Sequence, residues 1–223
     1  MRADIRLHAI LDPTRTRGRS LADMARAAVE GGATILQYRD KDAPTWTMMA
    51  RAREILAALE GSTVPLIVND RVDVALAANA HGVHIGQEDM HPEDARRLLG
   101  PGAIIGQTVK SAAHAAAVPL DAVDYVCIGG VFATASKDNP DPPVGLDGLS
   151  RLVATMRARR ADLPVGAIAG VTVDNTPAVI AAGADGVAVI SEIFMADDPA
   201  AAARALRTAV DAALSARNEE SSR

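Results

Sequence analysis

The sequence predicts an α/β protein that folds as a single-domain (β/α)8 barrel, a TIM barrel. Short apolar or β-branched runs alternate with longer, alanine-rich amphipathic stretches, and Gly, Pro or Asp residues separate them. The chain of 223 residues is long enough for one such domain. Eight repeats favour a closed barrel over an open doubly wound sheet. No Gly-x-Gly-x-x-Gly motif follows the first run, which argues against a dinucleotide-binding fold.

The expected strands follow one another along the whole chain. They are "RLHAIL" (6–11), "TILQYR" (34–39), "PLIV" (65–68), "HGVHI" (81–85), "AIIGQ" (103–107), "DYVCIG" (124–129), "PVGAIA" (164–169) and "DGVAVI" (185–190). Helical stretches such as "SLADMARAAVEGG" and "DPAAAARALRTAVDAALSA" lie between and after them. We expect the barrel to cover residues 1–216 and the polar residues 217–223 to form a disordered tail.

Composition narrows the classes of function. A net charge of −5 argues against broad binding to nucleic acid or to an anionic membrane. Aromatic residues make up only 2% of the chain, so wide stacking surfaces are not expected. The N-terminal residues lack the apolar stretch of a signal peptide, and no apolar run approaches the roughly 20 residues that cross a bilayer. We expect a cytoplasmic protein that acts on small molecules, and a homo-oligomer remains open.

Basic and amide side chains gather after the second expected strand, in "QYRDK". Alternate residues of a strand point to the same side, so Gln37, Arg39 and Lys41 are expected to face the barrel mouth together. An arginine and a lysine form a clamp for an anion such as a phosphate or diphosphate. The alternative is a solvated loop in which Arg39 only pairs with Asp40 or Asp42.

Acidic side chains follow the next two strands. Asn69 and Asp70 end the third run, and Glu88 and Asp89 follow the fourth. Two carboxylates beside an anion clamp predict Mg²⁺, which proteins hold with one or two carboxylates plus water and substrate phosphate. The alternative for Asp70 is a helix N-cap.

The remaining strands end in hydroxyl groups and glycines. Thr108 follows the fifth strand, and a long loop after the sixth contains Thr134, Ser136 and Lys137. Loops of that length in a compact domain are often functional, although an ordinary proline-rich crossover is the alternative. The loops after the last two strands are the recurrent phosphate site of such barrels. Gly170 permits close backbone approach there, and the Ile190–Ser191 amides are expected to complete the site.

Three side chains that often carry chemistry are interpreted as structural. His81 and His84 lack further partners at zinc spacing. Cys127 precedes the long loop and is interpreted as a small buried apolar residue.

The motifs "QYRDK", "ND", "HIGQED", the Thr-x-Ser-Lys loop, "AGVTVDN" and "AGADGVAVIS" together resemble, in order and spacing, the thiamine phosphate synthase family. The similarity runs from about residue 7 to 199. It implies a (β/α)8 transferase that joins a hydroxymethylpyrimidine diphosphate to a thiazole phosphate and releases diphosphate. Two phosphorylated substrates would account for the two anion sites.

The resemblance also implies roles for individual residues. It places the pyrimidine diphosphate against Gln37, Tyr38, Arg39, Asp40, Lys41, Asn69, Thr108 and Lys137. It places the thiazole phosphate against Thr134, Ala135, Ser136, Gly170, Ile190 and Ser191. Asp70 and Asp89 would hold Mg²⁺, and the cations Arg39, Lys41 and Lys137 would neutralise the leaving diphosphate.

The chain departs from the family pattern in three places. Ala133-Thr134-Ala135-Ser136-Lys137 stands where the family usually reads Pro-Thr-x-Thr-Lys, and "AIAG" (167–170) stands where it reads Gly-Ile-Gly-Gly. His8 replaces an aromatic residue on the first strand.

Two other functions compete with the synthase. One is a thiazole tautomerase, for which loss of the diphosphate clamp and the metal acids is expected. The other is a sensor that binds phosphorylated ligands without catalysis.

Overall fold

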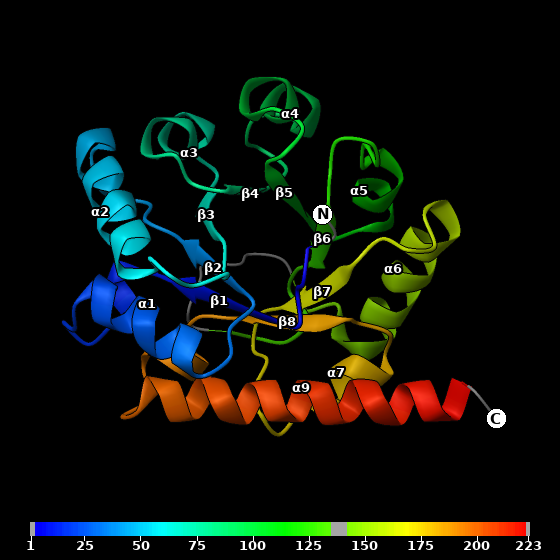
Figure 1. Cartoon of the computed structure of the whole chain (residues 1–223). Helices are drawn as coiled ribbons and strands as arrows, with labels where there is room; N and C mark the ends of the chain where they lie inside the picture. Colours follow the sequence, from blue (N-terminus) through cyan, green and yellow to red (C-terminus); the bar gives the residue numbers. More distant parts are fainter. Residues whose placement is uncertain (1–2, 135–141, 222–223) are drawn as a thin grey trace.

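Eight parallel strands close on themselves in sequence order, and helices surround them (Figure 1). The computed structural model describes residues 3–134 and 142–221. Each strand pairs with the next along the chain, and β1 also pairs with β8, which closes the sheet. The predicted (β/α)8 barrel is confirmed.

All the expected strands are present, with ends that differ from the prediction by at most two residues. The strands are β1 (Leu7–Leu11), β2 (Ile35–Tyr38), β3 (Leu66–Asn69), β4 (Gly82–Ile85), β5 (Ile104–Val109), β6 (Tyr125–Ile128), β7 (Val165–Ile168) and β8 (Gly186–Val189). Their carboxyl ends all meet at one end of the barrel because every pairing is parallel.

Helices cover the outside of the barrel between successive strands (Figure 1). They are α1 (Leu21–Glu30), α2 (Thr45–Ala58), α3 (Val72–Ala78), α4 (Pro92–Leu99), α5 (Ala112–Ala117), α6 (Gly145–Arg159), α7 (Thr176–Ala181), α8 (Ser191–Phe194) and α9 (Pro199–Ser221). A 3-10 turn, η1 (Pro13–Arg15), follows β1. The short α8 begins directly after β8, at the end of the barrel where the strands finish.

Alternation along each strand divides the buried side chains into two cores. Leu36 and Tyr38 of β2 belong to the large core between the barrel and its helices. Ile35 of the same strand packs with Ile67 and Tyr125 inside the barrel. A residue's position along a strand therefore decides whether its side chain faces a helix or the interior.

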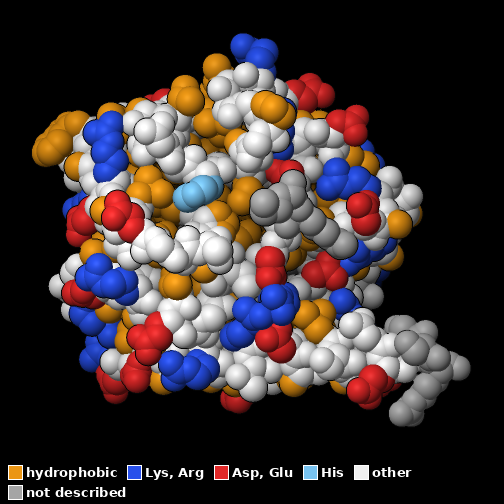
Figure 2. Space-filling model, viewed as in Figure 1, with side chains coloured by type: hydrophobic (Ala, Val, Ile, Leu, Met, Phe, Trp, Pro, Cys, Tyr) orange, Lys and Arg blue, Asp and Glu red, His pale blue; other side chains and the backbone are white. Residues whose placement is uncertain are grey.

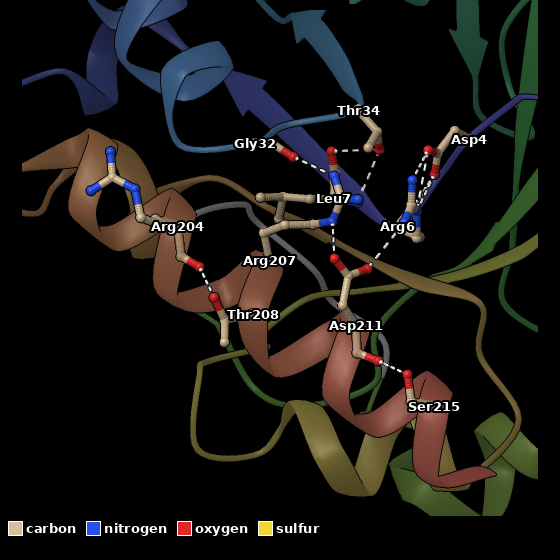
Figure 3. Close-up of polar contacts among 10 residues, drawn as sticks. All are labelled: Asp4, Arg6, Leu7, Gly32, Thr34, Arg204, Arg207, Thr208, Asp211 and Ser215. Carbon is tan, nitrogen blue, oxygen red and sulfur yellow. Dashed lines mark hydrogen bonds and ion pairs between the residues drawn. The ribbon is translucent and has the colours of Figure 1, made fainter. Parts of the chain in front are cut away.

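The C-terminal helix connects the start of the first strand to the loop before the second (Figure 3). Asp211 of α9 accepts hydrogen bonds from Arg6 Nη1 at 3.2 Å and from Arg207 Nε at 2.7 Å. Arg207 also donates from Nη1 to the carbonyl of Gly32 at 3.0 Å. These contacts lie at the amino-terminal end of the barrel, opposite the strand ends that were predicted to carry the site.

The helix α9 extends further than the sequence predicted. Arg217 donates to the carbonyls of Ile180 at 3.2 Å and Ala184 at 2.7 Å, and its guanidinium also pairs with Asp185 at 3.1 Å. These contacts dock the last turns of the helix on the barrel. The prediction of a disordered tail is therefore wrong for residues 217–221, which are helical. Residues 222 and 223 lie outside the described residues.

Candidate active site

A cavity of about 350 Å³ opens at the carboxyl ends of β5, β6, β7 and β8. Reacting groups usually lie at this end of a (β/α)8 barrel. Its wall includes Thr108, Lys110, Gly129, Gly130, Thr134, Gly170, Thr172, Ile190, Ser191 and Glu192. Ala, Val and Ile side chains make most of the rest of the wall, so hydroxyl groups and glycine backbone form the polar part of a mainly apolar lining, where a small anionic group can bind.

Four of the residues predicted to hold the thiazole phosphate line this cavity together. They are Thr134 after β6, Gly170 after β7, and Ile190 and Ser191 after β8. Three separate loops contribute them, so the closure of the barrel is what makes them neighbours. The predicted site residues Ala135, Ser136 and Lys137 lie outside the described residues.

Two of the loops around this cavity are pressed against each other. Gly170 has φ +63°, and a Cβ atom at that position would lie 2.5 Å from the carbonyl oxygen of Ala133. Phe132 N donates to the carbonyl of Ala169 at 3.1 Å, which holds the two loops in register. Ala169 itself has φ +84°, a left-handed conformation that costs a residue with a Cβ atom free energy. The wall is therefore close-packed backbone that includes one strained residue.

The residues at the end of β2 divide between the inside and the outside of the barrel. Gln37 is buried in the interior, with its amide nitrogen 3.1 Å from Nε2 of His8. Tyr38 points toward the helices, and its hydroxyl donates to Asp40 Oδ2 at 2.8 Å. Asp40 also forms an ion pair with Arg51 at 2.6 Å, so its carboxylate holds the β2–α2 loop. The side chain of Gln37 thus lies inside the barrel. The side chains of Tyr38 and Asp40 lie instead between the barrel and the surrounding helices.

The two cations of the predicted clamp bridge neighbouring strands. Arg39 forms an ion pair with Asp12, which directly follows β1, and not with an acidic neighbour in its own loop. Its side chain is 14% exposed, whereas that of Lys41 is 50% exposed. Lys41 forms an ion pair with Asp70, which directly follows β3. Both charged groups therefore lie at the mouth, and Lys41 is the more accessible to a ligand.

Two carboxyl groups meet beside this clamp. Asp70 and Asp89 lie close enough for a hydrogen bond between their side chains. The backbone holds each of them: Asp70 N donates to the carbonyl of His84 at 2.8 Å, and Asp89 Oδ2 accepts from Gly86 N at 2.6 Å. Asp70 has φ +62°, which is uncommon for a residue other than glycine. Its helix, α3, has Arg71 at the N-cap position, so the alternative role of Asp70 as the N-cap is not observed.

The environment separates the pKa values of the two acids. Burial raises the pKa of Asp70, but hydrogen bonds with Asp89 and Lys41 outweigh it, so the net shift is downward. Burial and the adjacent Asp70 raise the pKa of Asp89, against the opposing effect of the Gly86 amide. Asp70 therefore carries the negative charge more readily, and Asp89 binds a proton more readily when no cation compensates the pair.

This pair fits the ligand preference of Mg²⁺. The ion is commonly held by one or two carboxylates, with water and substrate phosphate in the other positions. Over residues 3–134 and 142–221, no group of three or more His, Cys, Asp or Glu side chains is arranged to hold a metal. A site with only two protein carboxylates, Asp70 and Asp89, beside a cationic clamp is the kind that Mg²⁺ shares with a phosphorylated substrate.

Two further predicted residues lie between the clamp and the cavity. Asn69 ends β3, half-buried, next to His84 of β4 in the sheet. Thr108 of β5 lies with its hydroxyl oxygen 2.8 Å from Nε2 of His84 and also lines the cavity. Thr108 thus connects the two halves of the mouth. His84 is buried, and both of its ring nitrogens lie within hydrogen-bond distance of a hydroxyl group.

Sequence reasoning missed three charged residues of this region. Lys110 and Glu192 line the cavity, and Asp12 orients Arg39. Lys110 lies two residues after Thr108, so the alternation that placed Thr108 at the mouth also places Lys110 there. The signal for Asp12 was its position directly after a strand, whereas Glu192 lies in the short helix α8 and no pattern in the sequence indicated it.

The surface offers no broad basic patch on the face that Figure 2 displays. Lys and Arg side chains are interspersed there with Asp and Glu side chains. None of the helices in the described part of the chain has the length and apolar character needed to cross a membrane.

A model of one protein family matches most of the chain. The family is described as thiamine monophosphate synthase, and the match covers residues 7–193. The chain belongs to this family. The resemblance drawn from the sequence motifs is thereby confirmed.

Relatives and solved structures agree with the family. A thiamine-phosphate synthase from Agrobacterium fabrum is 54% identical over 216 residues, covering 97% of this chain and 98% of that protein. One from Roseiflexus castenholzii is 46% identical, covering 90% of this chain and 86% of the relative. A solved thiamine phosphate pyrophosphorylase from Pyrococcus furiosus matches with a TM-score of 0.82 and 36% identity, over 96% of this chain and 98% of that one. The protein is an enzyme of the transferase class.

Proposed function

We propose that the protein condenses 4-amino-2-methyl-5-hydroxymethylpyrimidine diphosphate with thiazole phosphate, giving thiamine phosphate and diphosphate. One observation supports the proposal: two groups of residues of different construction, each suited to an anion, share one end of the barrel. Arg39, Lys41 and the Asp70–Asp89 pair suit a diphosphate with Mg²⁺. The cavity of about 350 Å³ suits a phosphate held by hydroxyl groups and backbone.

The proposed reaction begins with departure of diphosphate from the pyrimidine methylene carbon. The aminopyrimidine ring donates electrons to the resulting cation, and the thiazole nitrogen then forms the new C–N bond. This route needs no protein nucleophile. Cys127 fits that requirement, because burial raises the pKa of its thiol to about 12 and keeps it protonated.

The protein's contribution is electrostatic and positional. Arg39 and Lys41, joined in our proposal by Lys137, stabilise the negative charge that grows on the leaving diphosphate. Mg²⁺ held by Asp70 and Asp89 would supply further charge neutralisation at the same oxygens. The cavity after β5–β8 would hold the thiazole phosphate so that its nitrogen faces the methylene carbon.

The tautomerase alternative predicts a different barrel mouth. A tautomerase needs acid–base residues but no diphosphate clamp, and both clamp cations and both carboxylates are present here. A sensor would use the same groups for binding alone. The synthase therefore accounts for more of these groups than the tautomerase does, and product formation distinguishes the synthase from the sensor.

The test is a reconstituted reaction. Purified protein is mixed with the pyrimidine diphosphate, thiazole phosphate and Mg²⁺, with and without a chelator, and thiamine phosphate is followed by fluorescence after oxidation. Product that disappears with chelator supports the synthase and its metal. Binding of both substrates without product would contradict the synthase and favour the sensor, whereas aromatisation of a thiazole phosphate tautomer would favour the tautomerase.

A further inference from the structure

A chain of hydrogen bonds inside the barrel ends at the hydroxyl of Thr108, a residue that lines the cavity. His84 of β4 is buried and uses both ring nitrogens: Nδ1 lies 2.9 Å from the hydroxyl oxygen of Tyr125, and Nε2 lies 2.8 Å from Oγ1 of Thr108. Tyr125 begins β6 and is fully buried. The imidazole therefore connects a buried phenol to a hydroxyl that lines the cavity.

The fold fixes the position of the Tyr125 hydroxyl. The ring lies over Gly106 of β5, where a Cβ atom would come within 2.1 Å of the phenol carbon Cζ and 2.3 Å of the hydroxyl oxygen. Only glycine leaves room for the ring at this position. Within the described residues, His84 is the one hydrogen-bond partner of this hydroxyl. Burial raises the pKa of Tyr125 well above its usual value, so the phenol keeps its proton.

These constraints determine where the imidazole proton lies. The buried phenolic hydrogen needs an acceptor, because an unsatisfied buried donor costs about 1–3 kcal/mol. His84 Nδ1 meets that need only if it carries no proton, which leaves the proton of the neutral ring on Nε2. An imidazolium, or the other tautomer, would donate at Nδ1 and leave the phenolic hydrogen of Tyr125 without an acceptor.

The proton on Nε2 in turn determines what Thr108 presents. Nε2–H donates to Oγ1 of Thr108, so the hydroxyl hydrogen of that threonine is directed elsewhere. The methyl group of Thr108 lies on the side of Gly129, where an added Cβ atom would be 3.0 Å from Cγ2, and the hydrogen bond with His84 sets the orientation of the side chain. Because Thr108 lines the cavity and its hydroxyl oxygen accepts from His84, the hydroxyl hydrogen is available to donate to a ligand oxygen.

We propose that His84 and Tyr125 are positioning residues that hold Thr108 as an obligatory hydrogen-bond donor toward an anionic oxygen of the diphosphate substrate. The proposal rests on the proposed function for the identity of that substrate. It makes Thr108 selective for acceptors, and therefore for the unprotonated diphosphate over a ligand that presents a donor at the same point.

Three variants test the arrangement by kinetics. Tyr125→Phe removes the phenolic hydrogen and keeps the ring, whereas Thr108→Val removes the hydroxyl and keeps the shape. We expect each to lower kcat/KM for the pyrimidine diphosphate by about 10-fold to 100-fold, the range for a hydrogen bond to a charged group. We expect the double variant to be no worse than Thr108→Val, because Tyr125 acts through Thr108. Effects that multiply in the double variant would overturn the proposal.

A control separates positioning from general destabilisation. Thr34→Val also removes a hydroxyl that is bonded inside the fold, to the backbone of Leu7 at the other end of the barrel. We expect this variant to lose stability with an unchanged kcat/KM. If it loses as much activity as Tyr125→Phe, the effect of Tyr125 is one of stability and the proposal fails.

The tautomer itself has a direct readout that needs no turnover. With ¹⁵N-labelled histidine, the two-bond ¹H–¹⁵N correlation pattern of His84 distinguishes Nε2–H from Nδ1–H, and His84→Asn assigns the signals among the five histidines of the chain. We expect the Nε2–H pattern in the native protein and a mixture of tautomers in Tyr125→Phe. An Nδ1–H or imidazolium pattern in the native protein would overturn the proposal.

Binding of inorganic diphosphate tests the same arrangement even if no thiamine phosphate forms. We expect Thr108→Val to bind diphosphate about 10-fold more weakly than the native protein, because the variant has lost the donor that His84 holds in place. Titration calorimetry in the presence of Mg²⁺ measures the two affinities. Equal affinities would overturn the proposal, whatever the outcome of the reconstituted reaction.

Discussion

The two ends of the barrel both carry a cavity, but their polar groups are arranged differently. The amino-terminal cavity is the larger, at about 580 Å³, against about 350 Å³ at the carboxyl end. The acidic and arginine side chains that line it have oppositely charged partners within the fold: Arg6 with Asp4, Arg207 with Asp211, and Asp124 with Arg96. Figure 3 shows the contacts of Arg6 with Asp4 and of Arg207 with Asp211.

At the carboxyl end, some charged groups and backbone segments are held in energetically unfavourable arrangements. Two carboxyl groups, Asp70 and Asp89, face each other. Asp70 and Ala169, at this end, have positive φ although they carry a Cβ atom. In the loops at the amino-terminal end, the residues with positive φ are glycines, apart from Asn79 after α3. Backbone strain and a pair of adjacent carboxyl groups distinguish the end where we propose that substrate binds, whereas cavity volume does not.

The largest expected effect is on activity, from Asp89→Asn. The change removes one of two carboxylates and keeps an oxygen for the Gly86 amide, so we expect thiamine phosphate formation to fall at least 100-fold with the fold intact. Initial rates over a range of Mg²⁺ concentrations check this expectation. Turnover and Mg²⁺ dependence like those of the native protein would contradict the metal assignment.

The same variant should also change how thermal stability depends on pH. Because the pKa of Asp89 is raised in the folded state, its stabilising contribution is present below the usual carboxyl pKa and is lost as the pH rises through the folded pKa. Without Mg²⁺, Asp89→Asn should therefore gain thermal stability relative to the native protein as the pH rises from acid to neutral. A variant that is less stable at neutral pH would show that the pair is not under repulsion.

The next largest effect is expected on stability, from Thr34→Val at the amino-terminal end of the barrel. The Thr34 hydroxyl accepts from Leu7 N at 3.0 Å and donates to Leu7 O at 3.1 Å. Its loss leaves a buried amide unsatisfied, so we expect the free energy of unfolding, measured in urea, to fall by about 1–2 kcal/mol. We expect the rate of thiamine phosphate formation to stay within about twofold. A large loss of rate would contradict the division of roles between the two ends.

Ala169→Gly should have a smaller effect of the opposite sign. Relief of the positive φ at Ala169 outweighs the added flexibility of glycine in the unfolded chain, so we expect a gain of about 1 kcal/mol. For a chain of this size that corresponds to a rise of about 2–4 °C in Tm. An unchanged or lower Tm would show that the wall of the cavity is not strained.

The smallest effect is expected from Asp211→Asn on α9. Asp211 bridges Arg6 and Arg207, but its side chain is 43% exposed, and solvent screens such pairs. We expect a loss of less than about 1 kcal/mol in the free energy of unfolding, and a smaller loss in high salt. A loss that does not depend on salt would indicate a packing role instead.

The sequence predicted the barrel well because each strand is marked locally. Apolar runs bounded by Gly, Pro or Asp give the strand positions, and their number gives the closure. It predicted α9 less well, because the polar residues after position 216 resemble a tail and only the contacts of Arg217 with Ile180 and Ala184 show why they remain helical.

The sequence predicted which strand ends carry the site residues, but not which of their side chains contact one another. Alternation placed Gln37, Arg39 and Lys41 together, and the same alternation applied to Tyr38 and Asp40 would have directed them outward. The link from Tyr125 to Thr108 depends on pairing between β4, β5 and β6. No local pattern contains that pairing, so the sequence alone could not reveal it.

We propose that the chemistry takes place at the carboxyl end of the barrel, between a metal-assisted diphosphate site and a phosphate cavity. The most direct test compares Mg²⁺-dependent thiamine phosphate formation in the native protein, Asp89→Asn and Thr34→Val, with both substrates saturating. We expect chelator-sensitive product from the native protein, at least a 100-fold loss of rate in Asp89→Asn and a nearly native rate in Thr34→Val. No product from the native protein, or equal losses in the two variants, would contradict it.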